Sequence, residues 1–150
     1  MTVVVWDGKI IAADKQASQG DLKSLTTKIR RSGGGDILAW TGACENGMAL
    51  ADWYERGADS KEWPVFQKDA ESWCRLIVAS GGKVFTYEQL PVKQFVEEPF
   101  AAWGSGRDYA LGALAMGANA VKAVKVASEF STSCGLGVDS FKVGIIRAAV

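Results

Sequence analysis

The chain has 150 residues, of which 48% are hydrophobic and 23% charged, so one domain covering residues 1–150 with a substantial core is expected. Its 17 basic and 17 acidic side chains cancel, which removes any overall field that would attract nucleic acid or an anionic membrane surface. No apolar run approaches the ~18 residues of a membrane span, and no segment resembles a signal peptide. We therefore expect a cytoplasmic protein with no nucleic-acid partner and no membrane partner.

The absence of histidine and the spacing of the cysteines limit the catalytic and metal-binding mechanisms that the chain could use. The chain contains no histidine, and its cysteines at positions 44, 74 and 134 form no CxxC pair. Ser-His-Asp and Cys-His sites are excluded together with imidazole-ligated metals, and the cysteine spacing argues against a disulfide framework or a zinc site. We expect no metal and no cofactor. A general base would have to be a carboxylate, a lysine, a tyrosine or the terminal amine.

The first residues predict a β-hairpin that reaches the amino terminus. Residues 3–6 are a β-branched and aromatic run, residues 9–12 are a second and mostly apolar run, and Asp7-Gly8 between them is a two-residue turn signal. A turn of this length places Thr2 opposite Ala13.

Two further strands and a helix are predicted next along the chain. The polar residues 18–27 form a connection, after which 28–31 (KIRR) and 36–42 (DILAWTG) form a strand pair around a glycine turn. Residues 44–57 suit a helix, since apolar side chains recur at every third position from Met48 to Tyr54 and Gly57 can end it.

The second half of the chain mixes strand and helix patterns. The expected elements are a short helix from Pro64 within residues 64–73, a hairpin of 75–80 and 83–88, an irregular segment 90–104 ending in a short strand, helices over 108–117 and 120–130, and a closing strand over 138–150. Leu111 and Leu114 share one side of the first of these helices, and Asn119 can cap the second. Because strand runs and helix runs are segregated, the sequence predicts an α+β layer arrangement of antiparallel sheets covered by helices.

Four short segments, taken in their order along the chain, are more specific indicators of function than the composition or the secondary-structure patterns. They are Thr2 at the start of a strand, AAD at 12–14, TKI at 27–29 and GSGRDYALGA at 104–113. Together they resemble the proteasome β-subunit and HslV family of N-terminal-nucleophile (Ntn) hydrolases, and among these the short, phage-type members. The resemblance spans most of the chain and implies a four-layer αββα sandwich of two antiparallel sheets flanked by helices.

The resemblance also implies a role for each matching residue. Removal of Met1 would expose Thr2, whose Oγ would act as the nucleophile while its amine, which titrates near ~7.7–8, accepts the proton. Lys28 would be the cation that lowers the pKa of the attacking hydroxyl, and Asp14 would orient Lys28. The backbone N–H near Gly42-Ala43 would receive the oxyanion. Ser105 would hold the amine and its water.

Further features of the resemblance concern the substrate and the assembly. The backbone at Ala17 and Ser18 would pair with a peptide as an added strand. Ser131, in STSCG, stands where the family carries an aspartate, and it is a weaker candidate. The implied protein is a threonine peptidase within a homo-oligomeric ring, acting on unfolded polypeptide or peptides, with an ATP-dependent unfoldase as a possible partner.

Other interpretations of these residues stay open at this point. Thr2 alone carries little weight, Asp14 can simply end a strand, and Lys28 can belong to a solvated face with Arg30 and Arg31. Gly104-Ser105-Gly106 is not a dinucleotide fingerprint, because Tyr109 stands where the third glycine belongs. The alternatives for the whole chain are a catalytically degenerate, proteasome-like assembly protein and an Ntn amidase that acts on a small molecule.

Overall fold

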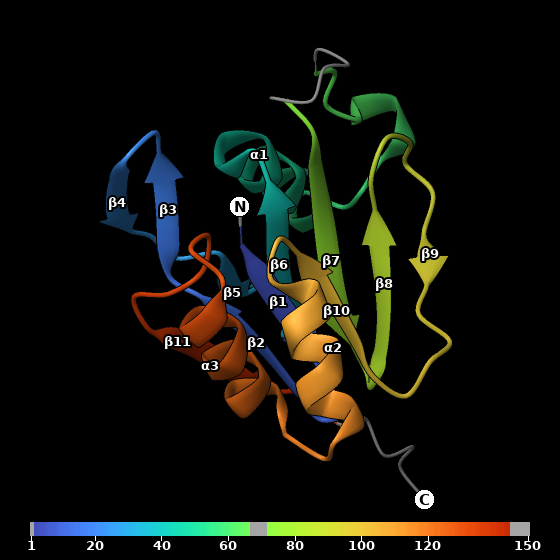
Figure 1. The fold of residues 1–150 in the computed structure, drawn as a ribbon. Coiled ribbons are helices and arrows are strands. Elements are labelled where there is room, and N and C mark those ends of the chain that lie inside the picture. Colours follow the sequence, from blue (N-terminus) through green and yellow to red (C-terminus); the bar gives the residue numbers. More distant parts are fainter. Residues whose placement is uncertain (1, 67–71, 145–150) are drawn as a thin grey trace, which may run out of the picture.

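The computed structural model describes residues 2–66 and 72–144, and within them two antiparallel sheets stack face to face (Figure 1). The first sheet has the order β10-β1-β2-β11, and the second has the order β5-β6-β7-β8-β9. The strands of the first sheet are β1 (Val3–Trp6), β2 (Ile10–Asp14), β10 (Ala101–Gly104) and β11 (Val138–Lys142). Those of the second are β5 (Ile29–Arg31), β6 (Ile37–Gly42), β7 (Cys74–Ser80), β8 (Lys83–Tyr87) and β9 (Gln94–Phe95).

Helices cover the outer face of each sheet. In Figure 1, α2 (Arg107–Ala115) and α3 (Ala120–Phe130) lie side by side against the first sheet, and α1 (Cys44–Glu55) packs on the second. A short 3-10 helix, η1 (Ser60–Glu62), follows α1. Three apolar clusters fill the spaces between helices and first sheet, between the two sheets, and between second sheet and α1. This arrangement confirms the predicted αββα sandwich.

The environment of strand β1 explains why its sequence is apolar without alternation. Val3 and Val5 pack toward α2 and α3, whereas Val4 and Trp6 pack toward the second sheet. Both faces of the strand are therefore buried, which removes the polar positions that a one-sided strand would show. The first residues of the chain are thus held at the centre of the sandwich.

The turn between β1 and β2 is longer than the predicted two residues. Trp6 pairs with Ile11 and Val4 with Ala13, so the register carries Thr2 past Ala13 toward the end of β2. The carboxylate of Asp7 holds this loop, because its Oδ1 accepts the N–H groups of Lys9 (2.8 Å) and Ile10 (2.7 Å). The prediction that Thr2 faces Ala13 was wrong.

Most of the other predicted elements are present. The strand pair after residue 28, the hairpin of β7 and β8, and all three long helices are confirmed, as is Asn119, whose side chain accepts the N–H of Lys122 at 2.9 Å. The apolar spacing in α1 misplaces one residue, since Met48 is 43% exposed while Leu50 and Trp53 face the core.

Residues 18–27 are not a simple connection. They contribute to a separate hairpin of β3 (Gln16–Gln19) and β4 (Leu22–Leu25), drawn at the upper left of Figure 1. Strand β9 was also not predicted. Part of the predicted 64–73 helix and the end of the predicted 138–150 strand lie outside the described residues. None of the described helices combines the length and apolar character needed to cross a membrane.

Candidate active site

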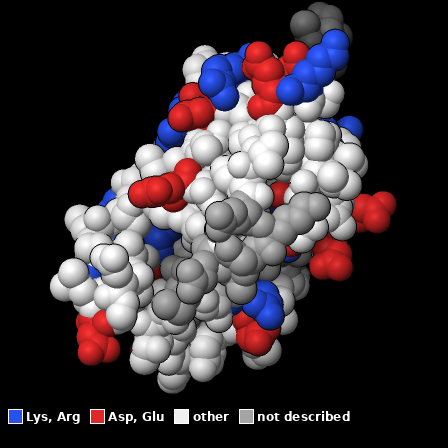
Figure 2. Space-filling view, turned by 90° about the horizontal axis from the view of Figure 1, so that it is seen from above, with Lys and Arg blue, Asp and Glu red and all other residues white. Residues whose placement is uncertain are grey.

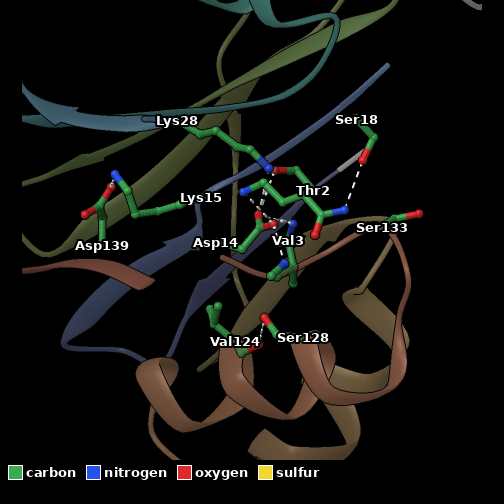
Figure 3. Close-up of polar contacts among 12 residues, drawn as sticks. Thr2, Val3, Asp14, Lys15, Ser18, Lys28, Val124, Ser128, Ser133 and Asp139 are labelled. Atoms are coloured by element: carbon green, nitrogen blue, oxygen red, sulfur yellow. Dashed lines mark hydrogen bonds and ion pairs between the residues drawn. The ribbon is translucent and has the colours of Figure 1, made fainter. Parts of the chain in front are cut away.

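Thr2, Asp14 and Lys28 converge where the two sheets meet. The Oγ1 of Thr2 donates to Oδ1 of Asp14 at 2.9 Å, and Nζ of Lys28 donates both to that same Oδ1, at 2.8 Å, and to Oγ1 of Thr2 (Figure 3). The three residues are only 2%, 0% and 5% exposed, respectively. A hydroxyl, an ammonium group and a carboxylate therefore contact one another in a largely buried site.

The carboxylate of Asp14 is fixed by its surroundings. Besides Thr2 and Lys28, its oxygens accept the backbone N–H groups of Val3 (3.1 Å), Gln16 (3.3 Å) and Gly135 (3.0 Å). A buried charge is costly unless it is paired and hydrogen-bonded, and these donors meet that requirement. Asp14 thus connects β1, the start of β3 and the loop before β11.

Lys28 reaches this carboxylate from the second sheet. It directly precedes β5, and its carbonyl oxygen accepts the N–H of Trp40 in β6 at 3.1 Å. The backbone of Lys28 is therefore tied to β6 while its side chain extends to the first sheet. This excludes the alternative that Lys28 belongs to a solvated face with Arg30 and Arg31, since Lys28 is buried.

A cleft of about 1280 Å³ opens beside Thr2 and Lys28. Its walls come from β3, from the junction of β6 with α1, and from the turn between β10 and α2. The sequence-derived candidates among its lining residues are Thr2, Ala17, Ser18, Lys28, Gly42, Ala43 and Ser105. Asp14 lies behind Thr2 and does not line the cleft, and neither does Ser131.

The Gly42-Ala43 junction requires a glycine and leaves one N–H group for the cleft. Gly42 has φ +90°, and a Cβ there would lie 2.3 Å from the carbonyl oxygen of Trp73. The N–H of Ala43 is already bonded to that same oxygen at 2.7 Å. Because N–H directions alternate along a strand, the N–H of Gly42 points to the side of β6 on which Trp40 bonds Lys28. Of the two candidate oxyanion donors, Gly42 is the one that the geometry favours.

The turn Gly104-Ser105-Gly106 packs directly against Thr2. Gly104 has φ +98°, and a Cβ there would lie 2.2 Å from the carbonyl oxygen of Thr2. The N–H of Gly106 donates to that same oxygen at 3.2 Å. The turn therefore fixes the backbone of Thr2 and brings Ser105 to the cleft.

Ser131 has a different environment. It follows α3, and its Oγ accepts the N–H of Ser133 at 3.2 Å. The neighbouring thiol of Cys134 is buried, and burial together with the charge of Asp14 raises its pKa. Burial and the charge of Glu88 raise the pKa of Cys74 to about 11, so these two thiols stay protonated at neutral pH.

Several residues around the site were not foreseen from the sequence. Gln16 and Gly135 donate to Asp14, and the side-chain amide of Gln16 also donates to Ser18 Oγ at 3.0 Å. Arg75 and Arg107 line the cleft. The one available signal was Arg75, a charged residue inside the otherwise apolar run of β7. Within residues 2–66 and 72–144, no group of His, Cys, Asp and Glu side chains could hold a metal ion.

Comparison with known proteins gives matches at the level of structure. No protein-family model matches the chain, and no curated protein matches it. Among solved structures, BPH of Thiobacillus denitrificans in complex with epoxomicin is 27% identical with a TM-score of 0.70, and the match covers 96% of this chain and 100% of that one. BPH alone is 26% identical with a TM-score of 0.70, covering 96% of this chain and 99% of that one.

A third structure, the eukaryotic HslV of Trypanosoma brucei, has the same fold. It is 20% identical with a TM-score of 0.69, and the match covers 94% of this chain and 97% of that one. The αββα sandwich and these whole-chain matches define an Ntn hydrolase fold. These neighbours are HslV-like, proteasome-type proteins, and they support an HslV-like Ntn hydrolase family for this chain.

Proposed function

We propose that the protein is an N-terminal threonine peptidase whose nucleophile is Thr2, exposed by removal of Met1 in the cytoplasm. The observation that carries this proposal is the contact of Thr2 Oγ1 with both Lys28 and Asp14 at the wall of the cleft. A small second residue such as threonine favours removal of the initiator methionine. The free amine then lies on the same residue as the hydroxyl that it must deprotonate.

In the proposed mechanism these groups act in two steps. The amine accepts the proton of Thr2 Oγ1, directly or through a water, while Oγ1 bonds to the substrate carbonyl carbon. The ammonium of Lys28 stabilises the negative charge on Oγ1, and the N–H of Gly42 binds the oxyanion. The amine returns its proton to the leaving nitrogen as the C–N bond breaks, which leaves an ester on Thr2. Water, deprotonated by the same amine, then attacks the ester carbon. The bond from that carbon to Oγ1 breaks, the carboxylic acid product leaves, and the amine returns the proton to Oγ1. Ser105 holds the amine and that water.

Strand β3 is the proposed platform for the substrate. One edge of β3 pairs with β4, and Ala17 and Ser18 line the cleft. An extended peptide that pairs with the backbone of these two residues would place its carbonyl groups beside Thr2. Polypeptide, rather than a small amide, is therefore the substrate class that we favour.

The proposed working form is a homo-oligomeric ring that admits unfolded chains, with an ATP-dependent unfoldase as a possible partner. A closed chamber would protect folded proteins from the exposed cleft. If the site is degenerate, the same surfaces would still support an assembly protein without activity. The decisive question is therefore whether Thr2 reacts.

A peptide epoxyketone such as epoxomicin tests this directly, since BPH is known in complex with it. Protein whose intact mass confirms the loss of Met1 should gain the mass of one inhibitor, and peptide mapping should locate the adduct on Thr2. The adduct and the hydrolysis of unfolded casein should both disappear in Thr2→Ala. The matched variant Thr27→Ala, an exposed threonine outside the cleft, should keep both. A free Thr2 amine without an adduct would reject the proposal in favour of the assembly protein.

A further inference from the structure

The side chains around the cleft carry charge of one sign. Lys28, Arg75 and Arg107 line it, and no aspartate or glutamate is among its described lining residues. The whole chain has a formal net charge of 0, and on the face seen in Figure 2 acidic and basic side chains are interspersed. The described lining of the cleft therefore carries an excess of positive charge that the chain as a whole does not have.

Lys28 is bound to Asp14, but Arg75 retains hydrogen-bonding capacity. Its guanidinium lies over the ring of Trp73, 5.2 Å from the centroid, and 3.4 Å from the carboxylate of Glu88. Glu88 has a shorter bond, of 2.7 Å, from Nε1 of Trp73. An arginine has five N–H donors, so this long contact leaves most of them for a ligand in the cleft.

Arg107 adds a second guanidinium next to Thr2. It is the first residue of α2, directly after Gly106, whose N–H bonds the carbonyl of Thr2. One Nη of Arg107 donates to the carbonyl of Gly104 at 3.2 Å, and its ion pair with Asp108 is long, at 3.9 Å. Because Asp108 is 87% exposed, solvent screens that pair and the arginine remains free to bind an anion.

The helix ends at the cleft reinforce this potential. Helices α1 and α2 both begin there, and their N-cap residues Ala43 and Gly106 make no side-chain capping bond. The amino end of a helix carries partial positive charge, and the exposed acids in these first turns, Glu45 and Asp108, offset it only in part. All these contributions favour an anionic group in the cleft.

We propose that the cleft selects peptides with a carboxylate close to the cleaved bond, and that Arg75 and Arg107 bind this carboxylate. The inference rests on the proposed peptidase function, for which it names the substrate class. Guanidinium groups match carboxylates in shape and form charge-assisted hydrogen bonds with them. The carboxylate comes from a Glu or Asp side chain or from the end of a short peptide, and binding can separate these two sources.

Binding to full-length Thr2→Ala, which cannot turn substrate over, gives a test that needs no catalysis. Three fluorescent peptides are compared by anisotropy: one with Glu and an amidated end, one with Gln instead, and one with Gln and a free carboxyl end. We expect a carboxylate to tighten binding about tenfold at low salt, with the gain shrinking in 1 M salt. The tighter peptide identifies the source of the carboxylate. Equal affinity for all three peptides would overturn the inference.

Variants then assign the effect to the two arginines. Arg75→Gln and Arg107→Gln should each reduce the preference for the carboxylate severalfold, whereas Arg56→Gln, an exposed arginine at the far end of α1, should leave it intact. Arg75→Glu should transfer the preference to a peptide with Lys in place of Glu, a gain that a merely damaged protein would not show. A full preference in both glutamine variants would overturn the assignment.

The two proposals fail in different ways. An epoxyketone adduct on Thr2 of the unmodified chain, combined with equal affinity for the three peptides, overturns the carboxylate site alone. A carboxylate preference without an adduct overturns the peptidase proposal and leaves Arg75 and Arg107 as a site that binds carboxylates without cleavage.

Discussion

Asp14 is the residue on which the geometry of the site depends. Its two oxygens accept five hydrogen bonds, from Thr2, Val3, Gln16, Lys28 and Gly135. These donors come from β1, from the start of β3, from the residue before β5 and from the loop before β11. One carboxylate therefore holds together segments that are far apart in the sequence.

We expect Asp14→Asn to lower the free energy of unfolding by about 3–5 kcal/mol, because it leaves the buried ammonium of Lys28 without its anion. The asparagine side chain also carries an NH₂ group where the carboxylate accepts backbone donors. Urea denaturation followed by tryptophan fluorescence measures the loss. The rate of adduct formation on Thr2 should fall in the same variant.

The matched control is Asp139→Asn, which breaks a 2.9 Å pair with Lys15 whose side chains are 22% and 31% exposed. A partly exposed pair of this kind contributes about 1 kcal/mol or less. The double variant Asp14→Asn/Lys28→Met should recover part of the lost stability, because no buried charge remains unpaired, yet it should form no adduct. Equal losses in Asp14→Asn and Asp139→Asn would contradict this account of Asp14.

At the scale of elements, turns rather than strands set the position of Thr2. The loop held by Asp7 sets the register of β1 against β2, and Asp7 Oδ2 also accepts the N–H of Ala120 at the start of α3. The glycine turn after β10 fixes the carbonyl of Thr2. These contacts join the first hairpin to α2 and α3.

Two glycines with the same φ allow the cost of backbone strain to be distinguished from the effect of a contact with Thr2. Gly104 and Gly117 both have φ +98°, but a Cβ at Gly104 would meet the Thr2 carbonyl, whereas at Gly117 no atom lies within 4 Å. Gly117→Ala should cost about 1–2 kcal/mol from the left-handed conformation alone. Gly104→Ala should cost more and should slow the epoxyketone reaction at least tenfold, because Thr2 must move. Similar reaction rates in both variants would contradict a positioning role for this turn.

The difference between local sequence patterns and long-range contacts also explains which elements could be predicted from the sequence. The strands β5 to β8 and the helices α1, α2 and α3 were predicted because each contains its own periodicity or cap. The register of β1 was not predicted, since it depends on hydrogen bonds of the Asp7 carboxylate that no local pattern reveals. The hairpin of β3 and β4 was missed because its residues are mostly polar and Leu22 and Leu25 are exposed.

At the scale of the whole molecule, that hairpin is a surface suited to contact between copies. Leu22 and Leu25 are 65% and 68% exposed on a two-stranded hairpin, an arrangement that is marginal in water without further packing. We expect the full chain to sediment as a species larger than the 16.0 kDa protomer. The double variant Leu22→Lys/Leu25→Lys should shift it toward the protomer, while Val65→Lys, at a 94% exposed position outside any strand, should not. A chain that sediments only as a protomer would contradict the ring.

Stability should also depend on alkaline pH. Burial raises the pKa of Cys74 from 9.0 to about 11, and it raises the pKa values of Tyr54, Tyr87 and Cys134 as well. The folded protein keeps these protons at a pH where the unfolded chain has lost them. The contribution of Cys74 to the free energy of unfolding should therefore be complete below about pH 9 and be lost between pH 9 and 11, by up to ~1.4 kcal/mol per pH unit. The contributions of Tyr54 and Tyr87 should start to fall above about pH 10.

Urea denaturation from pH 7 to 10.5 measures this decline. In Cys74→Ala, the free energy of unfolding should decline less steeply with pH when it is expressed relative to the value for this variant at pH 7. Met48→Ala, at a 43% exposed position without a titratable group, serves as the control with an unchanged slope. Constant stability across this range would contradict the role assigned to burial of these groups.

The layer architecture and the chemical options could be predicted from local patterns, because periodicity, caps and residue types are local properties. The apolar runs around Val3 and Ile37 indicate buried strands, and the absence of histidine leaves the terminal amine among the candidate general bases. The contact of Thr2, Asp14 and Lys28 could not be predicted in this way, since it depends on the register of one hairpin and the stacking of two sheets. The same holds for the arginines of the cleft, which come from β7 and α2 and are brought to one site by packing alone.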